Sequence, residues 1–473
     1  MSASTTRDGD SLAALRTVEA AILARTPEHD IVPSLDRVAM LVDLLGHPER
    51  AMPVIHLTGT NGKTSTARMV EALLRGFGVH TGRFTSPHLH SITERIALAG
   101  QPLTPSRFVA TYAEVEPYVG LVDERSEIPM SFFEVLVDMA FAAFAEAPVE
   151  VAVVEVGLGG SWDATNVADG QVAVITPIAI DHTRFLGPDV TSIATEKAGI
   201  IKPGAHVVLA QQLPAAAEVL ARRIAEVGAS AVRQGVDFGV QHRSLAVGGQ
   251  VLNLAGLGGS YDEVFLPLYG AHQAANAACA LAAVEAFLGG GTGRLDLDVV
   301  RESFAAASSP GRMEVVRTSP TVILDAAHNP AGARATAEAV AESFALGRVI
   351  GVIASFADKD VRGILEAFEP VLAEVVVTRS SSPRAMDPDA LAAVAVQVFG
   401  PDRVEVVARL DDAIDIAVGL ADDGGAGRLD SSAQGSVQDS APGSVQGSAL
   451  AGGVLVTGSI ATVAEARTLL GAR

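Results

Sequence analysis

The sequence is poor in cysteine, in positive charge and in long apolar runs, and each shortage excludes a class of protein. Cys279 is the one cysteine in 473 residues, which excludes an internal disulfide and a cysteine metal cluster and favours a reducing compartment. A formal net charge of −21 argues against nucleic acid or an anionic membrane as a partner. No apolar run approaches membrane-spanning length, and the polar start MSASTTRDGD is unlike a signal peptide. These absences predict a soluble, cytoplasmic protein.

The residues that are present favour a tightly wound α/β protein of two or three domains. Hydrophobic residues make up 49% of the chain, enough for full cores, whereas aromatic residues make up only 4%. Short apolar runs alternate with helical patterns, which is typical of a doubly wound, mostly parallel sheet. The predicted strands are 53–57, 79–85, 149–156, 171–176 and 206–210, and the predicted helices are 11–25, 35–45, 67–75, 131–146, 215–227 and 271–288. Residues 236–268 are rich in glycine and predict a small antiparallel subregion.

A domain boundary is predicted at residues 308–312, because the Pro-Gly pair of SSPGR lies between periodic segments. It separates a first domain, residues 1–308, from a smaller Rossmann-like α/β domain, residues 309–473. The second domain has predicted strands at 321–325, 348–354, 375–378, 404–407 and 453–458, and helices at 331–346 and 461–470. Residues 421–453 are of low complexity and are interpreted as a flexible surface insertion without a site.

The sequence TGTNGKTST, Thr58–Thr66, lies between a predicted buried strand and a predicted helix. A strand, a glycine-containing turn and a helix start together direct free backbone N–H groups at a phosphate chain. Lys63 would reach the outer phosphates and the hydroxyl of Thr64 would bind magnesium. The standard pattern has a glycine where this chain has Leu57. The alternative is an ordinary loop with an exposed lysine, but the register of glycines, lysine and hydroxyls favours a nucleoside triphosphate site.

Other polar residues follow the predicted strands, at the edge of the sheet where α/β proteins place their sites. Glu155 ends a buried strand before Gly157-Leu158-Gly159-Gly160 and is a candidate magnesium ligand, although acids at strand ends are common in solvent. Taken alone, Ser86 is more simply a turn serine and His182 a structural histidine. Lys197 beside Glu196 would be a solvated ion pair. Asp325 and His328, in DAAHNP, would be a turn and a helix cap.

The order of these segments is more specific than any one of them. TGTNGKTST, TSPHL, VVEVGLGGSWDATN, IDHTRFLG, EKAGIIKPG, GAHQAANA, PGR, DAAHNP and LVTGS together resemble the bifunctional folylpolyglutamate synthase/dihydrofolate synthase branch of the Mur ligase superfamily. The resemblance runs from about residue 51 to the end of the chain, apart from the insertion. It implies an ATP-dependent amide ligase that adds L-glutamate to dihydropteroate and to reduced folates through an acyl phosphate. Family members are commonly monomers.

The resemblance also implies roles for individual residues. The triphosphate cradle would be Asn61, Gly62, Lys63 and Thr64, with further nucleotide contacts from Asn276, Arg312 and Asp325. Two magnesium ions would be held by Thr64, Ser86, Glu155 and His182, and Lys197 would carry a carbamate that turns a cation into an anion. The catalytic residues would be Lys63, His182 and Lys197, and a monovalent cation is a further candidate cofactor. Glutamate would bind at His328 and Ser459, and the pteroate surface would comprise Ile31, Val32, Pro33, Ser34, Phe132, Phe133, Glu134, Trp162, Asp163 and Ala164.

One departure from the family pattern and three rival functions remain open at this point. The family has Arg-Leu where this chain has Ser161-Trp162, and the indole could stack on a pterin or belong to the core. The first rival is an enzyme that only extends the glutamate tail. A cell-wall Mur ligase would usually carry a further N-terminal domain, and only about fifty residues precede the phosphate loop here. A nucleotide-binding regulator would have no use for a second α/β domain.

Overall fold

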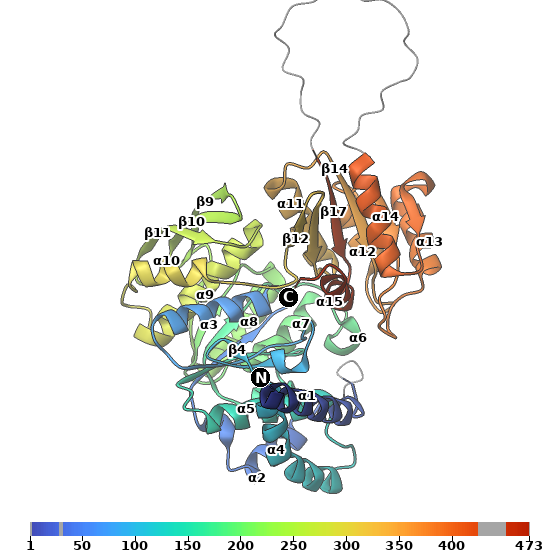
Figure 1. The fold of residues 1–473 in the computed structure, drawn as a ribbon. Helices are drawn as coiled ribbons and strands as arrows, with labels where there is room; N and C mark the ends of the chain where they lie inside the picture. Colours follow the sequence, from blue (N-terminus) through green and yellow to red (C-terminus); the bar gives the residue numbers. More distant parts are fainter. Residues whose placement is uncertain (1, 28–31, 424–450, 473) are drawn as a thin grey trace, which may run out of the picture. The chain divides into compact units, whose positions relative to one another are not determined.

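The computed structural model describes residues 2–27, 32–423 and 451–472 (Figure 1). By its internal contacts the chain divides into two compact units, Met1–Ser309 and Pro310–Arg473. Within the described residues, no helix combines the length and the apolar character needed to cross a membrane.

The N-terminal unit is built on a mixed sheet whose described strands follow the order β4-β3-β2-β5-β1-β6-β7-β8. In this spatial order, the neighbours from β2 through β5, β1, β6 and β7 to β8 pair in parallel. The pairs β2–β3 and β3–β4 are antiparallel. Their bounds are β1 (Val54–Thr58), β2 (Thr81–Phe84), β3 (Ile96–Leu98), β4 (Gln101–Pro102), β5 (Val151–Glu155), β6 (Gly170–Ile175), β7 (His206–Leu209) and β8 (Ser230–Arg233). This arrangement confirms the predicted doubly wound, mostly parallel sheet.

Alternate residues of β1 face opposite layers of helices, as the twofold period of a strand requires. Ile55 and Leu57 belong to the core beneath α3 (Lys63–Gly76) and α9 (Ala271–Gly289), while Val54 belongs to the core beneath α5 (Phe132–Glu146). Leu57, which replaces the expected glycine, is therefore a fully buried strand residue paired with Glu155 and Val174. The other helices of this unit are α1 (Ser2–Leu23), α2 (Asp36–Leu44), α4 (Pro105–Arg125), α6 (Thr183–Leu186), α7 (Val190–Lys197), α8 (Pro214–Val227) and α10 (Leu297–Ala305), with short 3-10 turns at Pro48–Arg50, Ile92–Arg95, Ala164–Val167 and Ala198–Ile200.

A small antiparallel sheet is attached to the same unit, as the sequence predicts. It has the order β11-β10-β9, from β9 (Gly239–Ala246), β10 (Gly249–Ala255) and β11 (Ser260–Leu266), and lies beside α9 and α10 (Figure 1). Glu285 of α9 is fully buried and accepts hydrogen bonds from the Leu257 and Gly258 amides at 2.6 and 2.9 Å and from the Tyr261 hydroxyl at 2.8 Å. This carboxylate fixes the turn between β10 and β11 to the helix.

The C-terminal unit has its own sheet, in the order β12-β13-β17-β14-β15-β16 among the described strands. Only β12 and β13 pair antiparallel, and β17, the last strand in the chain, lies between β13 and β14. The bounds are β12 (Glu314–Thr318), β13 (Thr321–Asp325), β14 (Arg348–Ile353), β15 (Glu374–Val377), β16 (Val404–Val406) and β17 (Gly452–Thr457), with α11 (Pro330–Ser343), α12 (Val361–Phe368), α13 (Pro388–Phe399), a 3-10 turn at Pro401–Arg403, α14 (Leu410–Asp423) and α15 (Ile460–Leu469).

Several elements were not predicted from the sequence, among them the helices α10, α12, α13 and α14 and the strands β3, β8 and β12, and three further differences follow. No helix was predicted over α4, although Phe108, Tyr112, Val115 and Val119 are buried at helical spacing. Helix α1 begins at Ser2 rather than at residue 11. The proposed insertion is shorter than 421–453, because residues 421–423 end α14 and residues 452–453 begin β17. Residues 424–450 lie outside the described part of the chain.

Candidate functional site

The phosphate loop joins β1 to α3 through a turn that only glycine fits. Gly62 precedes the first helical residue with φ of 89°, and a Cβ there would lie 2.6 Å from Oδ1 of Asn276. No side chain caps this helix start, and the N-terminus of a helix favours an anion. The loop thus has the local geometry predicted for a triphosphate cradle, and Asn276 of α9, itself 5% exposed, packs against it.

Two lysines converge on one carbonyl oxygen of this loop. The Nζ of Lys63 lies 3.2 Å from the carbonyl oxygen of Gly59 and 3.4 Å from that of Thr60. The Nζ of Lys197, at the end of α7, donates to the same Gly59 oxygen at 2.9 Å. Lys197 is 4% exposed, and its burial, together with the charge of Lys63, lowers the pKa of its ammonium to about 7. Lys197 is therefore not the solvated surface ion pair that the sequence alone would suggest.

Glu155, Thr64 and Ser86 are brought together beside the loop. The hydroxyl of Thr64 donates to the Glu155 carboxylate, at 2.9 and 3.0 Å from its two oxygens, and the amide of Ser86 lies 3.4 Å from Oε2. Glu155 is only 1% exposed, so its charge needs a compensating partner. A buried carboxylate next to two hydroxyl-bearing residues is a set of hard oxygen donors, which fits magnesium.

His182 comes from the next strand end of the sheet. It follows β6, which neighbours β1 on the side opposite to β5, so the segments after β5, β1 and β6 leave the same edge. The residue has φ of 50° and its amide donates to Oδ1 of Asp181 at 2.8 Å. Its Nε2 lies 3.8 Å from Oδ2 of Asp181. The side chain is 36% exposed, so the imidazole is accessible rather than part of the core.

An ion pair joins two of the three segments predicted to bind pteroate. Arg37 of α2 forms a bidentate pair with Glu134 of α5, with its Nε 3.0 Å and its Nη2 2.8 Å from Oε1. The same guanidinium donates to the carbonyl oxygen of Val32 at 3.0 Å. Val32 and Pro33 are exposed, and Ser34 hydrogen bonds to Asp36 at the start of α2. Ile31 lies outside the described residues.

An aromatic side chain of α5 packs against Gly157, in the loop that leads to the third segment. The ring of Phe133 lies beside Gly157, so a Cβ added to this glycine would be 2.4 Å from the Phe133 Cζ. The same ring packs edge-on against Phe84, with 5.7 Å between the ring centres. The guanidinium of Arg95 lies 4.9 Å from the centre of the Phe132 ring. Trp162 is partly buried and packs against the hydrophobic cluster that contains Leu186, so its indole contacts the core. Asp163 and Ala164 are 3% and 5% exposed.

The C-terminal unit places its candidate residues at the ends of two adjacent strands. Asp325 ends β13, and Ser459 follows β17, its parallel neighbour. Asp325 accepts from the amides of Met313 and Ala327 at 2.9 and 3.0 Å and from the Thr336 hydroxyl at 2.7 Å. Ser459 caps α15 by accepting from the amide of Thr462 at 3.1 Å. These two residues therefore have the structural roles, turn and helix cap, that the sequence left open.

His328 and Arg312 are more accessible than Asp325 and Ser459. The Nδ1 of His328 lies 2.9 Å from the carbonyl oxygen of Ala326, in the loop between β13 and α11, and its ring is half-buried. The next residue, Asn329, caps α11 by accepting from the amide of Gly332 at 2.8 Å. Arg312 is half-buried in the turn before β12.

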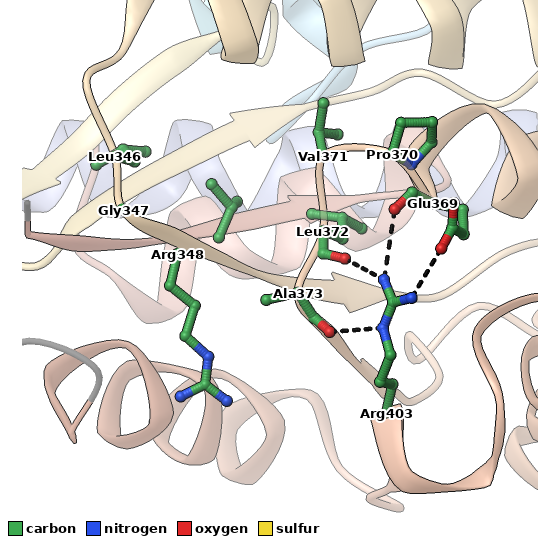
Figure 2. Close-up of a pocket in the computed structure, with 10 residues that line it drawn as sticks. Leu346, Gly347, Arg348, Glu369, Pro370, Val371, Leu372, Ala373 and Arg403 are labelled. Carbon is green, nitrogen blue, oxygen red and sulfur yellow. Dashed lines mark hydrogen bonds and ion pairs between the residues drawn. The ribbon is translucent and has the colours of Figure 1, made fainter. Parts of the chain in front are cut away.

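A surface pocket of this unit lies at the opposite edge of the sheet and does not coincide with these residues. It is lined by residues 346–349 at the start of β14, by residues 369–373 before β15, and by Arg403 before β16 (Figure 2). Arg403 donates to the carbonyl oxygens of Ala373 and Leu372 at 2.8 and 2.6 Å and pairs with Glu369 at 2.7 Å. Its guanidinium is committed to holding this loop, so the pocket does not present it to a ligand.

Two residues that organise the site, Arg37 and His56, were not singled out from the sequence. Arg37 lies at an ordinary position of α2, and His56 lies in the apolar strand β1. Glu196 accepts from the amide of Trp162 at 3.2 Å, which ties the DATN segment to α7. A polar residue within a buried strand is the one feature that could have singled out His56.

The fold and this loop define a Mur-type, ATP-dependent ligase. The model of the Mur ligase middle domain matches residues 57–284, and that of the Mur ligase glutamate ligase domain matches residues 311–427. The chain is 51% identical over 476 residues to the dihydrofolate synthase/folylpolyglutamate synthase of Mycobacterium tuberculosis, covering 98% of this chain and 95% of that protein. The chain belongs to the dihydrofolate synthase/folylpolyglutamate synthase family.

Solved structures agree with this membership. The folylpolyglutamate synthase of Mycobacterium tuberculosis complexed with ADP matches with a TM-score of 0.90 at 51% identity, over 98% of this chain and 99% of that one. Escherichia coli FolC in complex with DHPP and ADP matches with a TM-score of 0.76 at 32% identity, over 94% of each chain. The predicted family and ligase class are thereby confirmed.

Proposed function

We propose that this chain joins L-glutamate to dihydropteroate and to reduced folates, with ATP as the energy source. The γ-phosphoryl group passes to a carboxylate oxygen of the acceptor, giving an acyl phosphate and ADP. The amino group of glutamate then attacks the acyl carbon, and inorganic phosphate leaves as the amide forms. The observation that carries the proposal is the Glu155 carboxylate held by the Thr64 hydroxyl directly beside a glycine-flanked lysine, Lys63.

The N-terminal unit would bind the nucleotide through residues of the phosphate loop. Asn61, Gly62, Lys63 and Thr64 would cradle the triphosphate, with Asn276 against the turn and with Arg312 and Asp325 as further contacts. Magnesium would be held by Thr64, Ser86 and Glu155, with Glu155 and His182 at a second ion. Bound there, the metal would neutralise phosphate charge. Lys63 would add a cation at the γ-phosphate, where negative charge shifts during transfer.

Lys197 is proposed to carry a carbamate. At a pKa of about 7, a large fraction of the buried amine is neutral near physiological pH, and only a neutral amine attacks carbon dioxide. The product is an anion, which would suit a neighbouring metal better than a second ammonium beside Lys63. A monovalent cation is proposed on the family resemblance alone.

The acceptor and glutamate would bind at separate groups of residues. The pteroate side comprises the described residues Val32–Ser34, Phe132–Glu134 and Trp162–Ala164; the Arg37–Glu134 pair and the Phe133–Gly157 contact support this grouping. A flat ring system suits such aromatic surroundings. His328 and Ser459 are proposed for glutamate, with the accessible imidazole as the stronger candidate. We also propose that the protein is a cytoplasmic monomer.

Release of ADP under three conditions tests the proposal. The enzyme is given dihydropteroate with glutamate, then tetrahydrofolate with glutamate, then ATP alone. Turnover that requires both partners of each pair supports both activities. ATP hydrolysis that is indifferent to folate and glutamate would remove the ligase assignment.

A second candidate function is extension of the glutamate tail alone. One relative, 33% identical over 367 residues, is the folylpolyglutamate synthase of Lacticaseibacillus casei, whose name includes only that activity. Turnover with tetrahydrofolate and glutamate, but none with dihydropteroate and glutamate, would select it.

A further inference from the structure

His56 is a buried imidazole in the strand that leads into the phosphate loop. It is fully buried at the centre of β1, and its Nε2 lies 2.8 Å from Oγ1 of Thr165. Its Nδ1 is also buried, and it has no hydrogen-bond partner in the described part of the chain. The neighbouring strand β6 packs closely at this point, because a Cβ on Gly170 would approach the His56 Cβ to 2.9 Å.

Stability alone does not account for an imidazole at this position. Burial, with the nearby charge of Lys202, lowers the pKa of His56 to about 3, so the ring is neutral at working pH. A buried nitrogen without a partner costs about 1–3 kcal/mol, whereas an apolar side chain would pack in a strand without that penalty. The hydrogen bond to Thr165 is therefore the feature that distinguishes His56 from an ordinary core residue.

That hydrogen bond is the first step of a chain that ends on the loop after Glu155. The hydroxyl of Thr165 donates to Oδ1 of Asp163 at 2.5 Å. A hydroxyl has one proton to donate, so Thr165 must accept from the Nε2–H of His56 while Asp163 is ionised. The carboxylate of Asp163 also accepts from the amides of Leu158 and Thr165, at 2.8 and 3.0 Å. A rigid connection thus runs from β1 through two side chains to the amide of Leu158.

A second connection joins the same strand to the same loop. The hydroxyl of Thr58 donates to the carbonyl oxygen of Gly159 at 2.8 Å. His56 and Thr58 are two residues apart and therefore face the same side of the sheet. The segment from Leu158 to Thr165 is consequently fixed to β1 at two points, immediately before the phosphate loop begins.

We propose that His56 is a positioning residue that sets the pteroate-side segment Trp162–Ala164 in register with the phosphate loop. This inference rests on the proposed function, because it takes that segment as part of the acceptor surface. Transfer of a phosphoryl group requires the acceptor carboxylate in line with the γ-phosphate, and a small displacement of the acceptor costs rate steeply. His56 acts through Thr165 and Asp163 and touches neither substrate.

Two substitutions separate this role from simple packing. His56→Leu fills the space without a donor, whereas the amide nitrogen of His56→Gln can take the place of Nε2–H. We expect His56→Leu to raise the KM for dihydropteroate about tenfold, and to lower kcat by a similar factor, because a misplaced acceptor loses transition-state alignment. The affinity for ADP, measured by calorimetry without folate, is expected to change less than about twofold in both variants. His56→Gln is expected to restore most of the KM.

Amide hydrogen exchange tests the hydrogen-bonded connection from His56 to the Leu158 amide in the absence of substrate. The Leu158 and Thr165 amides are expected to be protected in the wild type and in His56→Gln, and to exchange about tenfold faster in His56→Leu. If His56→Leu keeps both the exchange rates and the KM for dihydropteroate, the positioning role is overturned. Equal loss in the Leu and Gln variants would also overturn it, since packing alone would then explain the effect. If the wild type turns over no folate while exchange responds as expected, the proposed function fails and the connection stands.

Discussion

In each unit a buried strand ends in an acidic residue, but the two acidic residues have different hydrogen-bond partners. Glu155 ends β5 of the N-terminal unit and Asp325 ends β13 of the C-terminal unit, and they are 1% and 4% exposed. Asp325 accepts from two backbone amides and one hydroxyl of its own surroundings, at 2.7–3.0 Å. Glu155 accepts from the Thr64 hydroxyl at 2.9 Å, and the amide of Ser86 lies 3.4 Å from its carboxylate. An acid fixed by amides organises a turn, whereas an acid facing hydroxyls can be shared with a metal.

The largest expected effect comes from removing the cation on the N-terminal side of this comparison. Lys63→Ala should lower turnover by at least about 10³-fold, because no other side chain of the loop can neutralise the γ-phosphate. ADP release with saturating dihydropteroate and glutamate measures it. Arg222→Ala, at an exposed position of α8, is the matched control and should be silent. Near-normal rates in Lys63→Ala would show that the loop is not the triphosphate cradle.

Glu155→Gln tests whether the Glu155 carboxylate is catalytic. We expect turnover to fall by about 10²–10³-fold and its dependence on magnesium concentration to weaken, since a neutral amide binds a hard cation poorly. The free energy of unfolding should change by less than about 1 kcal/mol, because the Thr64 hydroxyl can still donate to the amide oxygen. Rates measured over a series of magnesium concentrations test the first expectation. Urea denaturation measures the free energy of unfolding. A variant with unchanged magnesium response would contradict the metal assignment.

His328→Ala tests the accessible imidazole of the C-terminal unit. It should raise the KM for glutamate about tenfold and change the KM for ATP less than about twofold, as expected when a substrate contact is lost. Initial rates over a matrix of both substrates measure the split. The opposite pattern would remove His328 from the glutamate site.

Asp325→Asn tests the other half of the comparison, the acid held by amides. An asparagine must turn an NH₂ group toward a donor, so the free energy of unfolding of the C-terminal unit should fall by about 1–3 kcal/mol. Asp402→Asn, at an exposed position, is the control. Unchanged stability would mean that Asp325 is not the organiser of its turn.

The smallest effect concerns a buried carboxyl without a hydrogen-bond partner among the described residues, Asp138 of α5. Burial, with Glu134 and Glu49 nearby, raises its pKa well above the usual range, so the folded state keeps a proton that the unfolded chain releases. Stability therefore falls as pH rises from the unfolded pKa of about 4 toward the folded pKa. Asp138→Asn should remove this pH dependence. The stability that the substitution adds relative to the wild type should therefore be about 1 kcal/mol larger at about pH 8 than at about pH 5.

Denaturation midpoints at the two pH values measure the slope, with the exposed Asp298→Asn as the control. A slope equal to that of the wild type would show that Asp138 does not titrate in this range.

How much could be predicted differs between the backbone and the side chains. The phosphate loop, the strand ends and the two sheets follow from local patterns, because glycine positions and apolar runs restrict the backbone directly. The apolar residues of α4 also recur at helical spacing, so the sequence contained the signal for this helix. Its omission was an error of interpretation. The surroundings of Trp162 could not be predicted in this way, because its packing against the cluster around Leu186 depends on the tertiary arrangement of other elements.

The sequence by itself determined the ligase family, the parallel sheets and the strand ends at which polar residues gather, because these depend on residue type and spacing. Only the tertiary structure decided that Lys197 is buried on the Gly59 carbonyl, that Arg37 pairs with Glu134, and that His56 reaches Asp163 through Thr165. The contacts of Lys197, Arg37 and His56 each join residues that lie far apart in the sequence. Such pairings arise from packing in three dimensions, which no local pattern records.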